Sequence, residues 1–141
     1  MTAQVKDAFT FRYDKPEFPK GRRVKMLART DRMHAIVSVV KEGGENNLHS
    51  HNHQDGFYYV LKGRVTFYTT DDKVIGELGP SEGIVIPRGY PYWFESSGEE
   101  TLELLSVESY DAETKGEPMK DRIDHVPQKA HMTWLKEDAE R

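Results

Sequence analysis

The chain has 141 residues, the usual size of one compact domain, and it contains no cysteine. Disulfides, thiolate metal sites and cysteine nucleophiles are therefore excluded, so any metal must be held by nitrogen and oxygen. The 24 acidic and 20 basic residues are interspersed and give a formal charge of −4, so there is no basic stripe for nucleic acid. No apolar run approaches the roughly 20 residues that span a bilayer. We expect a cytoplasmic protein with neither nucleic acid nor a membrane as partner.

Residues 1–33 contain prolines and several basic residues but only scattered apolar ones. This composition predicts an arm outside the main domain, with its basic side chains in solvent. Phe9, Phe11 and Phe18 are the exception, because large apolar side chains would pin the arm to the domain or to a second subunit.

From residue 34 the sequence changes to short runs rich in β-branched and aromatic residues, separated by turn residues such as Gly43-Gly44 and Gly79-Pro80. The runs are HAIVSVV (34–40), FYYVL (57–61), RVTFYTT (64–70), KVIGEL (73–78), GIVIP (83–87), YWFES (92–96) and TLELLSVES (101–109). Many short strands without intervening helical patterns predict an all-β sandwich or barrel over 34–110, with mostly antiparallel pairing.

The last segment, 111–141, is again polar and is interrupted by Pro118 and Pro127. It predicts a tail with a possible short helix that carries Met132, Trp134 and Leu135. Its two histidines are expected to be solvated or capping residues rather than ligands.

His49-Ser50-His51 is the pattern that points to chemistry. In a β-strand, side chains at i and i+2 lie on the same face, with Cα atoms roughly 6.6 Å apart. The two imidazoles can therefore share one ion, and imidazole nitrogen suits Fe, Mn, Ni or Zn. Neighbouring strands would have to supply the remaining ligands.

The surroundings of this pair extend the pattern into four longer motifs, GGENNLHSH, FYYVLKG, LGPSEG and IPRGYPYWF. Over residues 34–109 the chain resembles the cupin superfamily. The resemblance implies a jelly-roll β-barrel with a pocket inside it, often a homodimer, and often a bound metal. The family's first motif ordinarily carries a glutamate where this chain has Gly56, and its second ordinarily carries a histidine where this chain has Tyr92.

Three nearby residues are candidates for the missing ligands. Asp55 is the first, since a one-residue bulge would turn its carboxylate inward; without the bulge it points outward. His53 reaches the same ion only if the chain turns, and is expected at the rim of the pocket. Gln54 offers a neutral oxygen donor, with no better claim than an ordinary loop glutamine.

Tyr58 and Tyr92 are candidate pocket residues, because Tyr58 has the strand parity of Gly56 and Tyr92 stands in the place of the histidine. Buried tyrosines commonly fill a core with a satisfied hydroxyl. Alternatively, Tyr92 is a hydrogen-bond donor or a proton-transfer group.

Two functions follow for a pocket that holds a small, polar or oxygen-rich molecule. In the first, His49, His51 and an oxygen ligand such as Asp55 hold one divalent ion of a mononuclear metalloenzyme, of the oxygenase, isomerase or lyase type. In the second, the pocket is free of metal. It is then a binding module, or an isomerase or lyase in which His49, His51 and Tyr92 perform acid–base chemistry.

Overall fold

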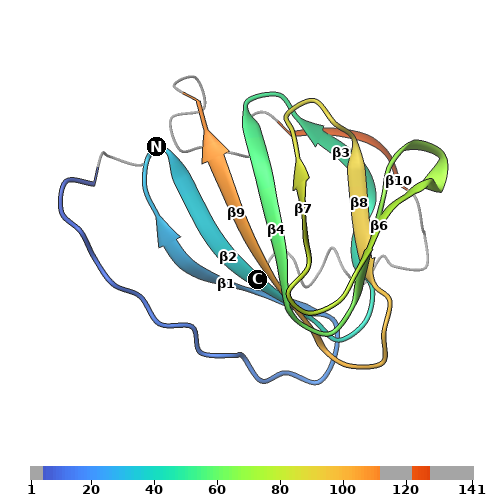
Figure 1. The fold of residues 1–141 in the computed structure, drawn as a ribbon, viewed down its shortest axis with the longest axis horizontal. Coiled ribbons are helices and arrows are strands. Elements are labelled where there is room, and N and C mark those ends of the chain that lie inside the picture. Colours follow the sequence, from blue (N-terminus) through green and yellow to red (C-terminus); the bar gives the residue numbers. More distant parts are fainter. Residues whose placement is uncertain (1–4, 112–121, 128–141) are drawn as a thin grey trace.

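The computed structural model of the chain describes residues 5–111 and 122–127. These residues form two antiparallel five-stranded sheets, in the orders β1-β2-β9-β4-β7 and β10-β3-β8-β5-β6, which enclose a common interior (Figure 1). The strands are β1 (Arg22–Arg29), β2 (Met33–Val40), β3 (Gly44–His51), β4 (Gln54–Lys62), β5 (Val65–Tyr68), β6 (Val74–Leu78), β7 (Gly83–Ile86), β8 (Tyr92–Ser96), β9 (Leu102–Tyr110) and β10 (Arg122–Pro127). A 3-10 turn, η1 (Thr70–Asp72), joins β5 to β6. The expected all-β jelly-roll barrel is confirmed.

Two strands lie in the segments that we expected to be an arm and a tail. β1 is an edge strand that pairs with β2, and β10 pairs with β3 at the edge of the other sheet. Both strands contain many charged residues, which edge strands tolerate and central strands do not, so the sequence shows no apolar pattern that would predict them. The possible helix with Met132, Trp134 and Leu135 lies outside the described residues.

The segment before β1 covers the outer face of one sheet. Phe18 is buried against Val37 and Val39 of β2, and the Tyr13 hydroxyl donates a 2.7 Å hydrogen bond to the Glu103 carboxylate. This cover explains why the outer face of β2, which carries Val37 and Val39, is apolar although it points away from the barrel interior. Phe9 and Phe11 remain exposed.

The barrel interior changes from apolar to polar along its axis. Inward-facing residues of β2, β9 and β4 lie in register, so each row across these strands forms one layer of the interior. From the apolar end, the layers are Val40–Leu102, Ser38–Leu104–Val60, Ile36–Ser106–Tyr58 and His34–Glu108–Gly56. The opposite sheet adds Val65, Phe67 and Phe94 to the apolar end, which leaves a polar interior at the other end.

Gly44 brings β3 close to β8. A Cβ atom at this position would lie 2.1 Å from the carbonyl oxygen of Phe94, a distance that no side chain tolerates. Further along the same strand pair, after a register shift between Glu45 and His49, His49 lies opposite Tyr92.

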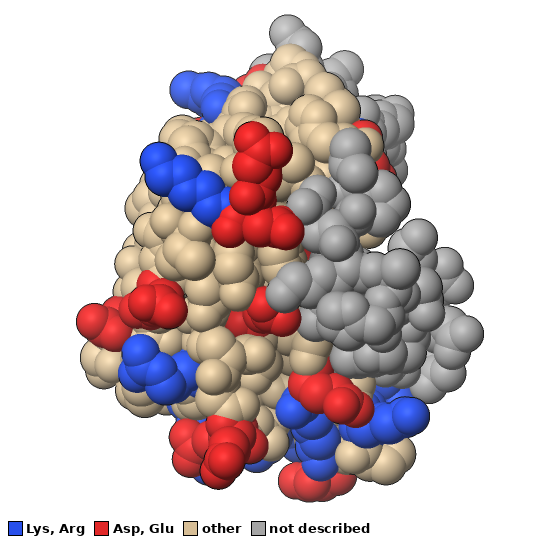
Figure 2. Space-filling model, turned by 90° about the vertical axis from the view of Figure 1, so that its right-hand side faces the viewer, with Lys and Arg blue, Asp and Glu red and all other residues tan. Residues whose placement is uncertain are grey.

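The surface in Figure 2 shows acidic and basic side chains interspersed on the face turned toward the viewer, without a patch of one sign. Within residues 5–111 and 122–127, no helix has the length and apolarity needed to cross a membrane.

Candidate active site

A cavity of about 170 Å³ occupies the polar end of the barrel. Four of the five residues that we expected in the site, His49, His51, Tyr58 and Tyr92, line it. The other lining residues are Arg22, His34, Ile36, Ser38, Glu45, Gln54, Phe94, Ser106, Glu108 and Arg122.

Asp55 and His53 are not among the lining residues. The Asp55 carboxylate accepts a 3.0 Å hydrogen bond from the backbone N–H of Arg88. The His53 Nδ1 atom lies 2.7 Å from an Asp111 carboxylate oxygen, and both of these side chains are about one-third exposed. Gln54 does line the cavity, although the sequence favoured Asp55 over it as a candidate ligand.

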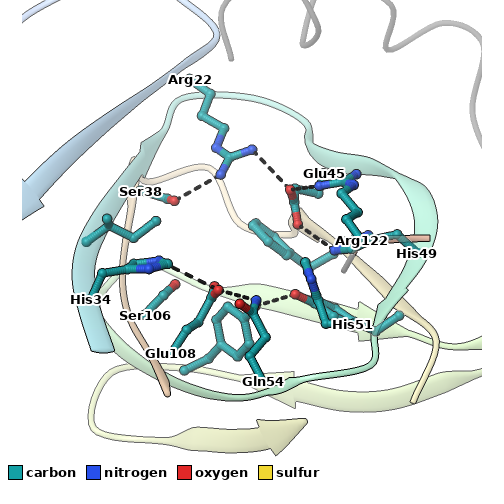
Figure 3. Close-up of a pocket in the computed structure, with 14 residues that line it drawn as sticks. Arg22, His34, Ser38, Glu45, His49, His51, Gln54, Ser106, Glu108 and Arg122 are labelled. Carbon is teal, nitrogen blue, oxygen red and sulfur yellow. Dashed lines mark hydrogen bonds and ion pairs between the residues drawn. The ribbon is translucent and has the colours of Figure 1, made fainter. Parts of the chain in front are cut away.

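One side of the cavity is built on the carboxylate of Glu45 (Figure 3). A guanidinium nitrogen of Arg122 lies 3.3 Å from it and one of Arg22 lies 3.7 Å from it. Arg22 also donates a 3.2 Å hydrogen bond to the Ser38 hydroxyl. Burial raises the pKa of Glu45, but His49 in its protonated form and the Arg22 and Arg122 guanidinium groups outweigh this at acidic pH and lower the pKa to about 2. Glu45 is therefore ionised at neutral pH.

His49 is a buried, neutral imidazole with one free nitrogen. Its Nδ1 atom lies 2.8 Å from the backbone oxygen of Asn47, and since that oxygen only accepts, Nδ1 carries the proton. The Nε2 atom, 3.5 Å from a Glu45 oxygen, is then the basic nitrogen. Burial lowers the pKa of His49, and the Glu45 carboxylate offsets only part of this effect.

Tyr58 and Tyr92 join their hydroxyls in a hydrogen bond at the base of the cavity. Both side chains are 3% exposed. Burial is the main cause that raises the pKa of both tyrosines well above 10, so both hydroxyls keep their protons at neutral pH. The ring of Tyr92 packs on the ring of His49, with centroids 4.4 Å apart.

Glu108 supplies a carboxylate beside Gly56, where the family's glutamate is missing. It faces Gly56 on β4 and His34 on β2 in the same layer. Its oxygen accepts a 2.5 Å hydrogen bond from the Gln54 amide and lies 3.6 Å from the His34 Nε2 atom. Burial, with smaller contributions from Arg29 and His51, lowers the pKa of His34 to about 4, so this imidazole is neutral.

The residues present do not fit a metal ion well. The His49 and His51 rings lie close, with centroids 5.2 Å apart, but the described residues hold no cluster of three histidine, aspartate or glutamate side chains able to bind a metal. The Glu45 carboxylate next to His49 is already paired with two guanidinium groups. A divalent cation at this place would meet both positive charges, so we derive no chemical step through a metal.

Sequence reasoning missed five ionisable residues of the cavity: Arg22, His34, Glu45, Glu108 and Arg122. A signal existed for three of them. Glu45 has the parity of His49 and His51 on β3, and His34 and Glu108 interrupt the apolar runs of β2 and β9 at inward positions. Arg22 and Arg122 gave no signal, because they lie on edge strands that the sequence does not reveal.

The fold and the cavity together define a small jelly-roll protein with a polar cavity inside its barrel. A family model described as the cupin domain matches residues 36–108, more than half of the chain, and the protein belongs to the cupin family. No curated protein matches the chain in sequence.

Solved structures share the fold at low identity. A Klebsiella pneumoniae protein with a double-stranded beta-helix domain is 18% identical over 81% of this chain and 91% of its own, with a TM-score of 0.63. KdgF from Halomonas sp. is 18% identical over 74% and 96%, with a TM-score of 0.61. Streptomyces Pac13 with uridine is 12% identical over 88% and 95%, with a TM-score of 0.64. At these identities the likeness shows the fold alone.

Proposed function

We propose that this cupin is an enzyme of the isomerase or lyase type that performs acid–base chemistry on a small, oxygen-rich molecule in its barrel. The observation that carries the proposal is the contact of His49 with Tyr92 on the cavity wall. Burial lowers the pKa of one and raises the pKa of the other, which gives a neutral base beside a protonated acid at the same pH.

The base is the Nε2 atom of His49. When it takes a proton from a carbon next to a carbonyl group, the imidazolium that forms lies 3.5 Å from the ionised Glu45 carboxylate. This charge partner stabilises the imidazolium, while the Asn47 carbonyl holds the ring in place through Nδ1.

The acid is the hydroxyl of Tyr92. In an elimination, the electrons of the broken C–H bond form a C=C bond, and the neighbouring hydroxyl leaves as water with the proton of Tyr92. Transfer of the proton from His49 to the tyrosinate then restores both groups, so the step needs no further reactant. The Tyr58 hydroxyl stabilises the tyrosinate by hydrogen bonding. In an isomerisation, the abstracted proton returns to the adjacent carbon instead.

One structural neighbour supports this choice of chemistry. Pac13 is described as a nucleoside dehydratase, and its uridine-bound structures include variants in which a tyrosine or a histidine is replaced. Loss of water is the elimination that an acid and a base side by side would catalyse.

The test is proton exchange with solvent. Wild-type protein is incubated in D2O with a set of small hydroxy-aldehydes, hydroxy-ketones and hydroxy acids, and ¹H NMR follows C–H exchange or loss of water. We expect Tyr92→Phe and His49→Asn each to lower the rate on any converted compound roughly 100-fold or more. Tyr59→Phe, on the outer face of β4, is the matched control and should leave the rate unchanged. Equal rates for wild type and both cavity variants would refute the proposal.

A metal-dependent enzyme is the second candidate. The Nδ1–Asn47 hydrogen bond leaves Nε2 of His49 free in the manner of a metal-binding histidine, and His51 is adjacent. Protein purified without a nickel column or chelator, analysed for Fe, Mn, Ni and Zn, decides this alternative. A metal-dependent enzyme requires a content close to one metal ion per chain.

A further inference from the structure

An apolar groove lies on the barrel surface at the free edge of β7. It has a volume of about 260 Å³ and is lined by six aliphatic or aromatic residues, Ile75, Ile84, Val85, Ile86, Pro87 and Tyr90. Val85 is 61% exposed, and Phe57, which lies opposite it on β4, is 47% exposed. Exposed apolar side chains that gather in one place are typical of a surface that another molecule covers.

The backbone at this edge is open to another strand. The Val60 N–H group donates a 2.9 Å hydrogen bond to the Glu82 carbonyl oxygen, and such pairs recur at every second residue of an antiparallel ladder. Ile84 and Ile86 therefore bond to β4, whereas the N–H and C=O groups of Val85 point to the free edge. The other edge strands, β1, β6 and β10, carry charged residues, but β7 has none. Because charges help to keep a sheet edge from pairing with another chain, β7 is suited to receive an added strand.

The N-terminal arm has the matching character. Residues 5–12 lie outside the strands and are exposed throughout. Phe9 and Phe11, which are 50% and 59% exposed, are two positions apart, so both side chains point to the same side of an extended chain. Figure 1 shows this segment, in dark blue, standing clear of the sheets on the side of β1, whereas β7 is the opposite edge of that sheet. The chain thus has an exposed apolar segment and an exposed apolar groove at separate places.

We propose that two copies of this chain exchange their N-terminal arms, so that residues 5–12 of one copy pair with the β7 edge of the other. Val85 supplies the backbone N–H and C=O groups for the added strand, and one phenyl ring enters the groove. A cavity of about 150 Å³ takes one benzene ring, so the groove of about 260 Å³ has room for the ring of Phe9 or Phe11.

The surface available to this exchange is sufficient for a stable dimer. The exposed parts of Phe9 and Phe11 together equal about one phenylalanine side chain, or about 200 Å². Two arms and the groove surface that they cover bury about 800 Å² through the rings, and the other exposed residues of the arms bring the total to the roughly 1,200 Å² of a stable interface. One arm alone falls short of this area, which favours a reciprocal, symmetric exchange.

The exchange places the partner's arm behind the wall of the active site. Ile86, Pro87 and Tyr90 line the groove and also border a smaller space of about 10 Å³. Tyr58 and Tyr92 line the same small space. The three shared residues therefore lie between the partner's arm and the tyrosine pair.

Single cysteines test the contact directly, because the chain contains none of its own. Full-length Phe11→Cys and Val85→Cys proteins are co-expressed and oxidised, and mass spectrometry of the tryptic peptides identifies the disulfide. The control pairs Phe11→Cys with Val24→Cys, since Val24 is an exposed apolar residue on β1, the other edge of the same sheet. We expect roughly tenfold or more cross-linked dimer from the first pair, because a disulfide forms only where the two Cα atoms come within about 7 Å.

Three other results of this experiment overturn the proposal. Equal cross-linking of Val85→Cys protein on its own would show that two β7 edges pair with each other. A disulfide that forms only within single chains of the double variant Phe11→Cys/Val85→Cys would show that the arm covers its own groove. Cross-linking of the first pair no stronger than that of the control would show that the arm does not reach β7.

A charge placed in the groove gives a second readout. Light scattering should find a dimer for wild type and a monomer for Val85→Lys, because the ammonium group would be buried unpaired under the partner's arm. Val24→Lys is the matched control and should remain a dimer. Val85 is exposed in the single chain, so thermal unfolding of Val85→Lys should still be cooperative. A dimeric Val85→Lys, or a monomeric wild type, contradicts the proposal.

Discussion

The Glu45 carboxylate links the stability of the barrel to pH. Its pKa falls from the usual 4.5 to about 2 in the folded protein, and its side chain is only 18% exposed. At about 1.4 kcal/mol per pH unit, this fall of about 2.5 units corresponds to about 3 to 4 kcal/mol of unfolding free energy. Because the folded pKa lies below the unfolded one, the contribution is complete above about pH 5 and is lost as the pH falls toward 2.

The variant Glu45→Gln isolates this contribution. Urea unfolding at pH 7 should show it less stable than wild type by about 3 to 4 kcal/mol, because Arg22 and Arg122 lose their charged partner. The difference between the two proteins should shrink to less than half of this value at pH 3. Glu100→Gln, at an exposed glutamate, is the control and should follow wild type at every pH. If the wild-type and Glu45→Gln stabilities fall in parallel from pH 7 to pH 3, the assignment of a low pKa to Glu45 is wrong.

Three further predictions concern the tyrosines, the pH dependence of the reaction and the arm. Tyr58→Phe and Tyr92→Phe should each lower the free energy of unfolding, measured with urea, by about 1–3 kcal/mol, because either change leaves the other buried hydroxyl unpaired. The double variant should lose less than the sum of the two single losses, and additive losses would disprove the coupling. The value of kcat/KM should be constant between about pH 6.5 and 10, because the pKa of His49 is lowered and the pKa of Tyr92 is raised. It should fall only below pH 6.5, and a decrease that begins above pH 6.5 as the pH is lowered would exclude neutral His49 as the base. The family resemblance leads us to expect a homodimer, and Phe9 and Phe11, 50% and 59% exposed, are the side chains that we expect to contact the partner. Light scattering should then find a dimer in wild type and a monomer in Phe9→Ser/Phe11→Ser, and a monomeric wild type would contradict this.

Much of the barrel could be predicted from the sequence because its central strands carry a strong pattern. The run 34–40 is apolar and β-branched, and the glycine turns mark its end. Strand periodicity predicted that His49 and His51 share one face, the resemblance to cupins implied a pocket inside the barrel, and both residues line the cavity. The edge strands β1 and β10 could not be predicted, since their charged residues form no apolar periodicity.

The electrostatics of the cavity lay beyond sequence reasoning for a different reason. Glu108 lies beside Gly56, more than 50 positions away in the chain, only because β4 and β9 pair in one particular register. Arg22 and Arg122 approach Glu45 from opposite ends of the described chain. Such contacts depend on strand order and register, which no local pattern contains.

The central claim is that the groups of this cavity move protons without a metal ion. The most direct measurement is the rate of C–H exchange or water loss in D2O for wild-type protein before and after EDTA treatment, with metal content determined on the same samples. We expect the same rate in both samples, with a metal content well below one ion per chain. A rate that vanishes with EDTA and returns with one divalent ion would contradict it.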